Sequence, residues 1–196
     1  MIVIDDKLLI KMEKKTRADM KEELGVPEGV TIKIEDGIFM VKGQKGDVHK
    51  KLYNPRVVSR VIGNKIVFEA KGATQREKKL IKSYLAHLRN MLRGVGEGHS
   101  YKLKICSGHF PMAVSVKGEV FEIKNFIGET VPRTLNLPEG VNVKIEGQEI
   151  LVEGVDKEKT SQTAALIEKL TRRPGFDKRI FQDGIFMIEK DGKPIK

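Results

Sequence analysis

Four histidines and one cysteine are the side chains of this chain best suited to hold a metal or to act as a nucleophile. His49, His87, His99 and His109 show no metal-ligand spacing with one another or with Cys106. His87 falls at the edge of a predicted apolar helix face, which favours a packed core histidine. Cys106 would be a nucleophile only beside a poised base, so a buried structural thiol is the better interpretation.

The acidic and glycine-rich segments show no catalytic or nucleotide-binding pattern either. Asp36, Asp183 and Asp191 each precede a glycine, an arrangement typical of turns. Residues 94–98 (GVGEG) lack the spacing and the Lys-Ser/Thr ending of a phosphate-binding loop, and we interpret them as a flexible joint. The sequence therefore predicts no enzyme activity, no metal and no cofactor.

Basic residues give the clearest chemical signal. The chain of 196 residues has 37 Lys and Arg against 27 Asp and Glu, a net charge of +10. The excess is concentrated, because Lys42–Arg93 contains 14 basic and 3 acidic residues. Such an imbalance usually indicates a polyanionic partner, most often nucleic acid.

A predicted helix carries part of this charge. Thr74 followed by Glu77 is a capping-box pattern for its first turn. The apolar face that should cover a sheet comprises Leu80, Ile81, Tyr84, Leu85, Leu88, Met91 and Leu92. On the other side, a basic stripe falls within about 60° at 100° per residue. The stripe suits a phosphate backbone, or equally a solvated face, and comprises Lys78, Lys82, Arg89 and Arg93.

An internal repeat indicates how the chain is organised. Residues 32–46 (IKIEDGIFMVKGQKG) match 114–128 (VSVKGEVFEIKNFIG), and 57–68 match 141–152. Apolar and polar residues alternate in both copies, which is the period of a strand with one buried face. Turn dipeptides that close a hairpin each lie at 36–37, 63–64, 117–118 and 147–148. A second helix follows at about 157–172, with an apolar side of Ala164, Leu166, Ile167 and Leu170.

These patterns predict an α+β fold of two tandem duplicated modules, each an antiparallel sheet of two hairpins backed by one helix. The first module spans residues 26–97 and the second 98–190. Residues 1–25 form an extension that we expect to be a charged helix ending at Gly25. Residues 179–188 resemble another hairpin, turning at 183–184, and 191–196 a short, mobile basic tail.

Composition limits where the protein works. A single cysteine excludes an internal disulfide framework and suits a reducing compartment. No apolar run approaches the roughly 20 residues that span a bilayer, and Asp5 and Asp6 interrupt the N-terminus. The sequence thus predicts a cytoplasmic protein without membrane contact.

Several strings together form a recognisable signature. They are the joint and strand at 94–105, the loop at 109–111 (HFP), the stretch 122–129 (EIKNFIGE) with Arg133, and 162–167 with 179–184 (RIFQDG). In these strings the chain closely resembles the large-subunit ribosomal protein family L-six, in its archaeal and eukaryotic branch. The resemblance covers about residues 26–190. Phe186 departs from the pattern, because the family commonly has a tyrosine there, and the change removes a hydroxyl.

This resemblance implies two sheet-and-helix modules, as the repeat predicts independently. It also implies a structural constituent of the large ribosomal subunit that binds large-subunit rRNA near the sarcin–ricin stem-loop, mainly through the second module. Neighbouring ribosomal proteins and nearby translation factors would be its other partners, and the protein would be a monomer within the ribosome. The implied rRNA-binding residues are His109, Phe110, Pro111, Lys124, Asn125, Arg133, Lys178, Arg179 and Phe181.

The chemistry of these residue types suits that task. Lys and Arg reach phosphates, Asn bonds to sugar or base edges, and an exposed Phe or His can stack on an unpaired base. Phe126 is expected in the core, and Phe181 fits either role. The concentration of basic residues favours the first module as the main RNA-binding part, whereas the resemblance favours the second module. An RNA-binding accessory protein outside the ribosome, an enzyme acting on RNA, and an all-protein scaffold remain the alternatives.

Overall fold

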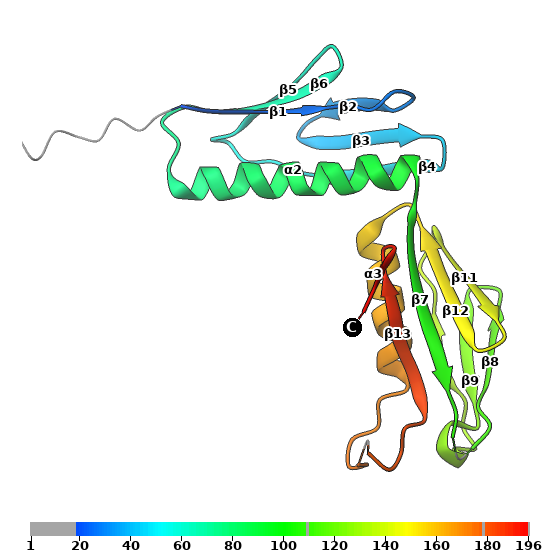
Figure 1. Ribbon diagram of the computed structural model, residues 1–196. Coiled ribbons are helices and arrows are strands. Elements are labelled where there is room, and N and C mark those ends of the chain that lie inside the picture. The colour runs from blue at the N-terminus through cyan, green and yellow to red at the C-terminus, as the bar shows by residue number, and fades with distance from the viewer. Residues whose placement is uncertain (1–18, 109, 178, 196) are drawn as a thin grey trace, which may run out of the picture.

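The computed structural model describes residues 19–108, 110–177 and 179–195, and it shows two modules that meet at a sharp bend (Figure 1). The first module runs through β1 (Met20–Gly25), β2 (Thr31–Glu35), β3 (Ile38–Gly43), β4 (Gly46–Lys51), β5 (Val58–Ile62), β6 (Lys65–Ala70) and α2 (Gln75–Gly96). The second runs through β7 (His99–Cys106), β8 (Ala113–Lys117), β9 (Val120–Lys124), the 3-10 turn η2 (Phe126–Gly128), β10 (Arg133–Asn136), β11 (Val141–Glu146), β12 (Glu149–Gly154), α3 (Lys157–Leu170), β13 (Gly184–Lys190) and β14 (Lys193–Pro194).

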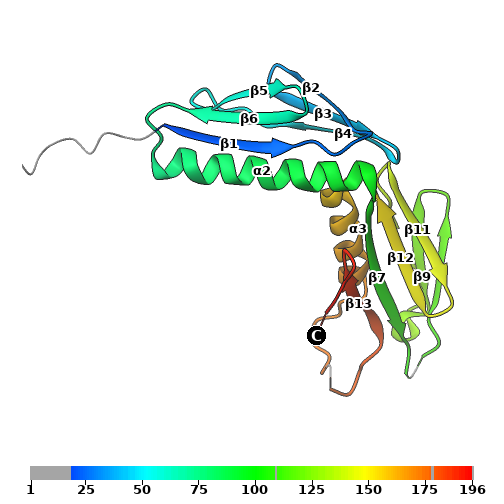
Figure 2. The same cartoon turned by 45° about the horizontal axis from the view of Figure 1, so that its top comes forward.

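The two modules share one topology. In the first, β1-β6-β5 and β2-β3-β4 are antiparallel sheets, so each predicted hairpin is extended by one further strand. In the second, β7-β12-β11 and β8-β9-β10 repeat these orders, and β13 and β14 add to the free edge of β7. α2 and α3 each cover one side of their own module (Figure 2). The predicted α+β fold with an internal duplication is confirmed.

Alternating strand residues and one face of each helix form the two cores. Phe39 and Phe68 are fully buried with their rings 5.9 Å apart, and they pack with Ile81 and Leu88 of α2. Equivalent apolar side chains of the second module pack around α3, namely Leu103, Phe121, Ile123, Ile150, Ala164 and Ile167. Each fully buried side chain of this kind contributes about 1.5–3 kcal/mol, so the helices stay on their sheets.

The first turn of α2 has the predicted capping box. The backbone N–H of Thr74 donates to Glu77 at 2.8 Å, and the Thr74 hydroxyl also donates to that carboxylate. These bonds from Thr74 lower the pKa of Glu77 to about 2, because they favour its charged form. The predicted apolar face of the helix is buried against the sheet except for Leu80, which is half-buried.

Residues 94–98 are not the flexible joint that their glycines suggested. α2 continues through Gly96, and only Glu97 and Gly98 connect it to β7. Tight packing explains the difference: Val95 is fully buried, and a Cβ at Gly94 would overlap the backbone carbonyl oxygen of Val155. Glycine therefore serves here as a point of close approach between the modules.

Both ends of the described chain differ from the predicted extension and tail. Residues 20–25 form β1, which pairs with β6 because Met20, Glu22 and Leu24 alternate toward the sheet; they are not helical. The rest of the expected helix lies outside the described residues. At the other end, β14 pairs back onto β13, so the tail is part of a hairpin.

Two further predictions in the second module are corrected. Residues 179–182 form a turn followed by irregular backbone and not a strand, because Asp177 bonds this segment locally, and β13 pairs with β7 instead. α3 ends at Leu170, and Leu166 is 44% exposed. Thr160 and Thr163 are buried on the inner face of α3, since their hydroxyls donate to carbonyls one turn back at 2.7 and 2.8 Å.

A buried charge cluster fixes the bend. The fully buried His99 ring has Nδ1 2.8 Å from Asp191 Oδ1 and Nε2 3.0 Å from the Asn90 carbonyl oxygen. Both neighbours are acceptors, so the ring donates to both only when it is protonated. Arg93 and Lys157 lie 3.0 and 3.4 Å from the other Asp191 oxygen. Asp191 thus joins α2, β7 and α3 from the β13–β14 turn.

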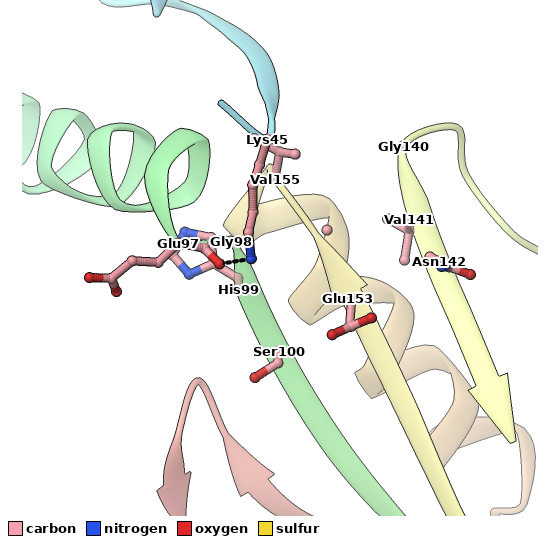
Figure 3. Close-up of a pocket in the computed structure, with 11 residues that line it drawn as sticks. Lys45, Glu97, Gly98, His99, Ser100, Gly140, Val141, Asn142, Glu153 and Val155 are labelled. Atoms are coloured by element: carbon pink, nitrogen blue, oxygen red, sulfur yellow. Dashed lines mark hydrogen bonds between the residues drawn. The ribbon is translucent and has the colours of Figure 1, made fainter. Parts of the chain in front are cut away.

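A second contact closes the other side of the bend (Figure 3). Lys45, in the turn between β3 and β4, donates from its backbone N–H to the Val95 carbonyl at 3.0 Å and from Nζ to the Glu97 carbonyl. A hollow of about 690 Å³ lies beside this lysine, between the first module and the ends of β7, β11 and β12. The modules are therefore held together by polar contacts from both sides.

Candidate nucleic-acid interface

The residues predicted to bind RNA converge at one end of the second module. They lie on the loop 107–112 after β7, on the loop 125–132 that contains η2, and on the segment 171–183 between α3 and β13. Figure 1 shows these segments together at the end of the module farthest from the first one. His109 and Lys178 lie outside the described residues, and the other predicted positions are all in these segments or at their borders.

Side-chain hydrogen bonds tie the three segments to one another. Asn125 Nδ2 donates to the Pro111 carbonyl at 3.0 Å, which joins the first two loops. The backbone N–H of Gly108 donates to Asp183 Oδ1, which joins the first loop to the third segment. Asn125 and Ile127 have left-handed backbones, with φ of 58° and 49°. Residues other than glycine rarely adopt this conformation, because it strains their backbone. The hydrogen bonds of the loop therefore hold these two residues in place.

Arg133 is the central brace of this end. Its guanidinium donates to both Glu129 oxygens at 2.7 Å and to the Leu170 carbonyl, and it lies 4.4 Å over the ring of Phe126. The bonds from Arg133 outweigh partial burial and hold the pKa of Glu129 below its ordinary value. Phe126 is 1% exposed, so it is a core residue, as expected. The guanidinium of Arg133 is thus largely used inside the protein.

The other predicted residues are more accessible. Lys124 and Arg179 have side chains 52% and 89% exposed, and Arg179 is held by Asp177 at 2.7 Å. Pro111 is exposed, while Phe110 is half-buried. Phe181 is half-buried with its ring 4.9 Å from that of Phe176 in an edge-on contact.

A groove of about 730 Å³ runs between these loops and the end of α3. Its lining combines cations with aromatic rings: Lys169, Arg172 and Arg173 lie with Phe176 and Phe181. The Arg173 guanidinium lies 4.2 Å over the Phe176 ring. Such a surface can neutralise phosphates and stack on bases.

Sequence reasoning missed the cations of this groove. The string TRRPGF at 171–176 places two arginines beside an aromatic residue, a pattern typical of nucleic-acid contact that could have identified them. Cys106 was expected to be buried, but it is half-buried and lines the same groove. It lies there because β7 ends at the groove.

The basic stripe of α2 is only partly as predicted. Lys82 and Arg89 are exposed, and within the described residues they have no ion pair. Lys78 is half-buried, and Arg93 is committed to Glu97 and Asp191 at 3.2 and 3.0 Å. Both residues leave the stripe because of where they lie: Lys78 lies toward the sheet, and Arg93 lies toward the junction between the modules.

His87 is also not the core residue that was expected. Its side chain is 36% exposed and lies 3.2 Å from Lys50 Nζ and 3.5 Å from Glu158. The buried histidine is His99, which the sequence did not distinguish. Among the described residues there is no group of three or more His, Cys, Asp or Glu side chains that could hold a metal. In the same part of the chain, no helix is long and apolar enough to cross a membrane.

Two duplicated α+β modules carry a loop end that combines cations with aromatic rings. This arrangement defines a class of proteins that bind a partner through a preformed surface. The family described as "Ribosomal protein L6" matches residues 26–98 and 110–184. The chain therefore belongs to this family of ribosomal proteins.

Three archaeal relatives show how far the similarity extends, each named large ribosomal subunit protein uL6. The protein from Methanococcus vannielii is 40% identical over 176 residues, covering 90% of this chain and 97% of its own. That from Methanosarcina mazei is 37% identical over 172 residues, 88% of this chain and 98% of its own. The protein from Nanoarchaeum equitans is 42% identical over 184 residues, which cover 90% of this chain and 96% of its own.

Proposed function

We propose that this protein binds large-subunit rRNA near the sarcin–ricin stem-loop through the loop end of its second module. The observation that supports this most is the convergence of three distant segments, each carrying predicted RNA contacts, at one cross-linked end. A surface fixed by internal bonds loses little conformational entropy on binding, so it suits recognition of a folded RNA by shape.

Each accessible side chain of this end has a role that its chemistry supports. Lys124, Arg172 and Arg179 neutralise phosphates, because they are exposed cations of the loop end and Arg172 lines the groove. Phe181 and the Arg173–Phe176 pair offer faces on which an unpaired base can stack. The protein acts by holding the RNA in one geometry, without catalysis, beside neighbouring ribosomal proteins and near the docking site of translation factors.

The test is a binding measurement with an rRNA fragment that contains the sarcin–ricin stem-loop, across a salt series. A scrambled hairpin of equal length is the control RNA. The variant Lys124→Gln/Arg179→Gln should reduce the slope of log affinity against log salt by about 1.4–1.8, because two phosphates contribute about 0.7–0.9 each. The matched control Lys33→Gln/Lys42→Gln removes two exposed lysines from the far face of the first-module sheet.

Two results would contradict the proposal. Equal affinity for native and scrambled RNA would leave a basic protein with no specific site. Equal slopes for the two variants would remove the loop end from the interface. Co-sedimentation with large subunits in low but not in high salt would favour an accessory protein outside the ribosome.

A further inference from the structure

The bend leaves most of one face of α2 uncovered. One side of α2 packs on the first-module sheet, and the other faces the open angle between the modules, where α3 and the C-terminal hairpin form the second wall (Figures 1 and 2). The C-terminal end of this open face meets the second module through Asn90 and Arg93. The remainder of the face continues away from the junction.

Three cations follow one another along this uncovered part. Lys79, Lys82 and Arg89 are exposed, and within the described residues none of them has an ion pair. At 1.5 Å per residue they span about 15 Å of helix. Ser83 and Ala86, which are small and exposed, lie between them, so a ligand can approach the backbone closely.

No negative charge on the helix competes for these cations. Between residues 78 and 96 the sequence has no Asp or Glu, and the one acid in the first turn, Glu77, is buried in the cap. Most cations that surround the sheets of the second module differ in this respect, as Lys102, Lys117 and Lys144 each lie within 3.4 Å of a carboxylate. The positive charge of α2 is thus available to an external anion.

The face also lacks what a protein partner would use. Stable protein interfaces have an apolar or aromatic centre. Within the described residues, the exposed large apolar side chains lie on β5, on loops, on α3 and on β13, and α2 has none. A surface of cations and small residues without an apolar anchor fits a phosphate backbone better than a protein.

We propose that the exposed face of α2 is a second RNA contact, centred on Lys79, Lys82 and Arg89. It binds the phosphate backbone of an rRNA segment that lies in the angle between the modules. This proposal rests on the proposed function, since it assumes an rRNA that also reaches the loop end. Two contacts on one rigid body raise the effective concentration of the second, so both RNA segments are held in a fixed relation.

The experiment compares three forms of the full chain on a complete large-subunit rRNA transcript. They are the unaltered protein, the variant Lys79→Gln/Lys82→Gln/Arg89→Gln, and the matched variant Lys33→Gln/Lys42→Gln/Lys51→Gln. The matched variant removes the same charge from the same module, but from exposed strand positions on the face of the sheet away from α2. Affinity is measured across a salt series, and hydroxyl-radical footprinting identifies the protected nucleotides.

The helix variant should lower the salt slope by about 2–3 and weaken binding about tenfold at moderate salt, because three phosphate contacts are lost. It should also lose one protected segment while keeping protection of the sarcin–ricin region. Equal slopes and footprints for the helix and matched variants would overturn the proposal. Loss of the proposed function would instead appear as missing protection of the sarcin–ricin region in all three proteins.

Discussion

Some of the residues predicted to bind RNA also stabilise the fold of the protein, and Arg133 is the clearest example. Its guanidinium satisfies two carboxylate oxygens and a backbone carbonyl, and it covers an aromatic ring. A planar fork of five donors can do this, whereas the single ammonium of lysine cannot. We therefore expect Arg133 to influence RNA binding mainly through the loops that it positions.

The variant Arg133→Gln should lower the free energy of unfolding by about 1.5–3 kcal/mol, because it breaks charged hydrogen bonds and leaves Glu129 without its main partner. Urea unfolding measures this. Arg133→Lys should recover only part of the loss. If both variants were as stable as the unaltered protein yet bound the sarcin–ricin fragment weakly, Arg133 would contact RNA directly.

Asp191 gives a prediction of pH dependence. Burial raises its pKa, but the His99 hydrogen bond and the charges of His99, Arg93 and Lys157 outweigh burial and hold the pKa below the ordinary value of 3.8. A carboxyl with a lowered pKa in the folded state stabilises the protein above its unfolded pKa. That stabilisation is lost as the pH falls through the folded value.

The variant Asp191→Asn should therefore be less stable than the unaltered protein by about 1.5–3 kcal/mol at pH 7, because charge-assisted bonds are lost. Below about pH 4 the difference should shrink, since the carboxyl begins to bind a proton there in the unfolded chain and binds one in the folded protein only at lower pH. Urea unfolding at pH 7, 5 and 3 measures this. A difference that stayed constant down to pH 3 would show that shape, and not charge, is responsible.

At the scale of elements, the C-terminal end of α2 decides how the modules meet. Gly94 lies against the backbone carbonyl of Val155, whereas a Cβ at Gly96, two residues further on, would have no neighbouring atom within 4 Å. The same helix therefore contains one glycine that packing requires and one that it does not.

The variant Gly94→Ala should destabilise the protein by about 1–3 kcal/mol, because the methyl group forces the helix away from a backbone atom that cannot rotate aside. The control Gly96→Ala should be neutral or stabilising by up to about 1 kcal/mol, since alanine favours a helix. Thermal unfolding of both proteins checks this pair. Equal changes in stability for the two variants would show that the structure around Gly94 accommodates the methyl group at little cost.

For the whole molecule, the rigid bend sets the separation of the loop end and the α2 face. Each surface alone carries few free cations, so a strong complex needs both surfaces on the same RNA. The cluster of His99 and Asp191 lies at the junction, beside the C-terminal end of the α2 face, and contains none of the proposed contact residues, so it affects binding by holding the angle.

A loosened junction should therefore discriminate between short and long RNA. Asp191→Asn should bind the isolated sarcin–ricin fragment as the unaltered protein does. On the complete large-subunit rRNA its affinity should fall several-fold, because the second contact is no longer pre-positioned. Filter binding at pH 7 measures both affinities. A similar loss on the short fragment would show that the variant damages the loop end itself.

The sequence alone determined the α+β class, the duplication, the hairpin turns and the helix cap. Each of these follows from local information, such as alternation with a period of two, turn dipeptides, or the spacing of Thr74 and Glu77. The motifs of 109–133 and 179–184 likewise indicated the family and, with it, the segments of the proposed RNA-binding end.

Tertiary structure decided which of those residues are available. Arg93 leaves the basic stripe, Arg133 becomes a brace, and His99 becomes a buried hydrogen-bonding partner of Asp191, because each contacts residues far away in the chain. The glycines of 94–98 suggested flexibility, yet α2 continues through Gly96, and Gly94 packs against the backbone of Val155. Contacts of this range leave no periodic or local signal, so only the folded chain shows them.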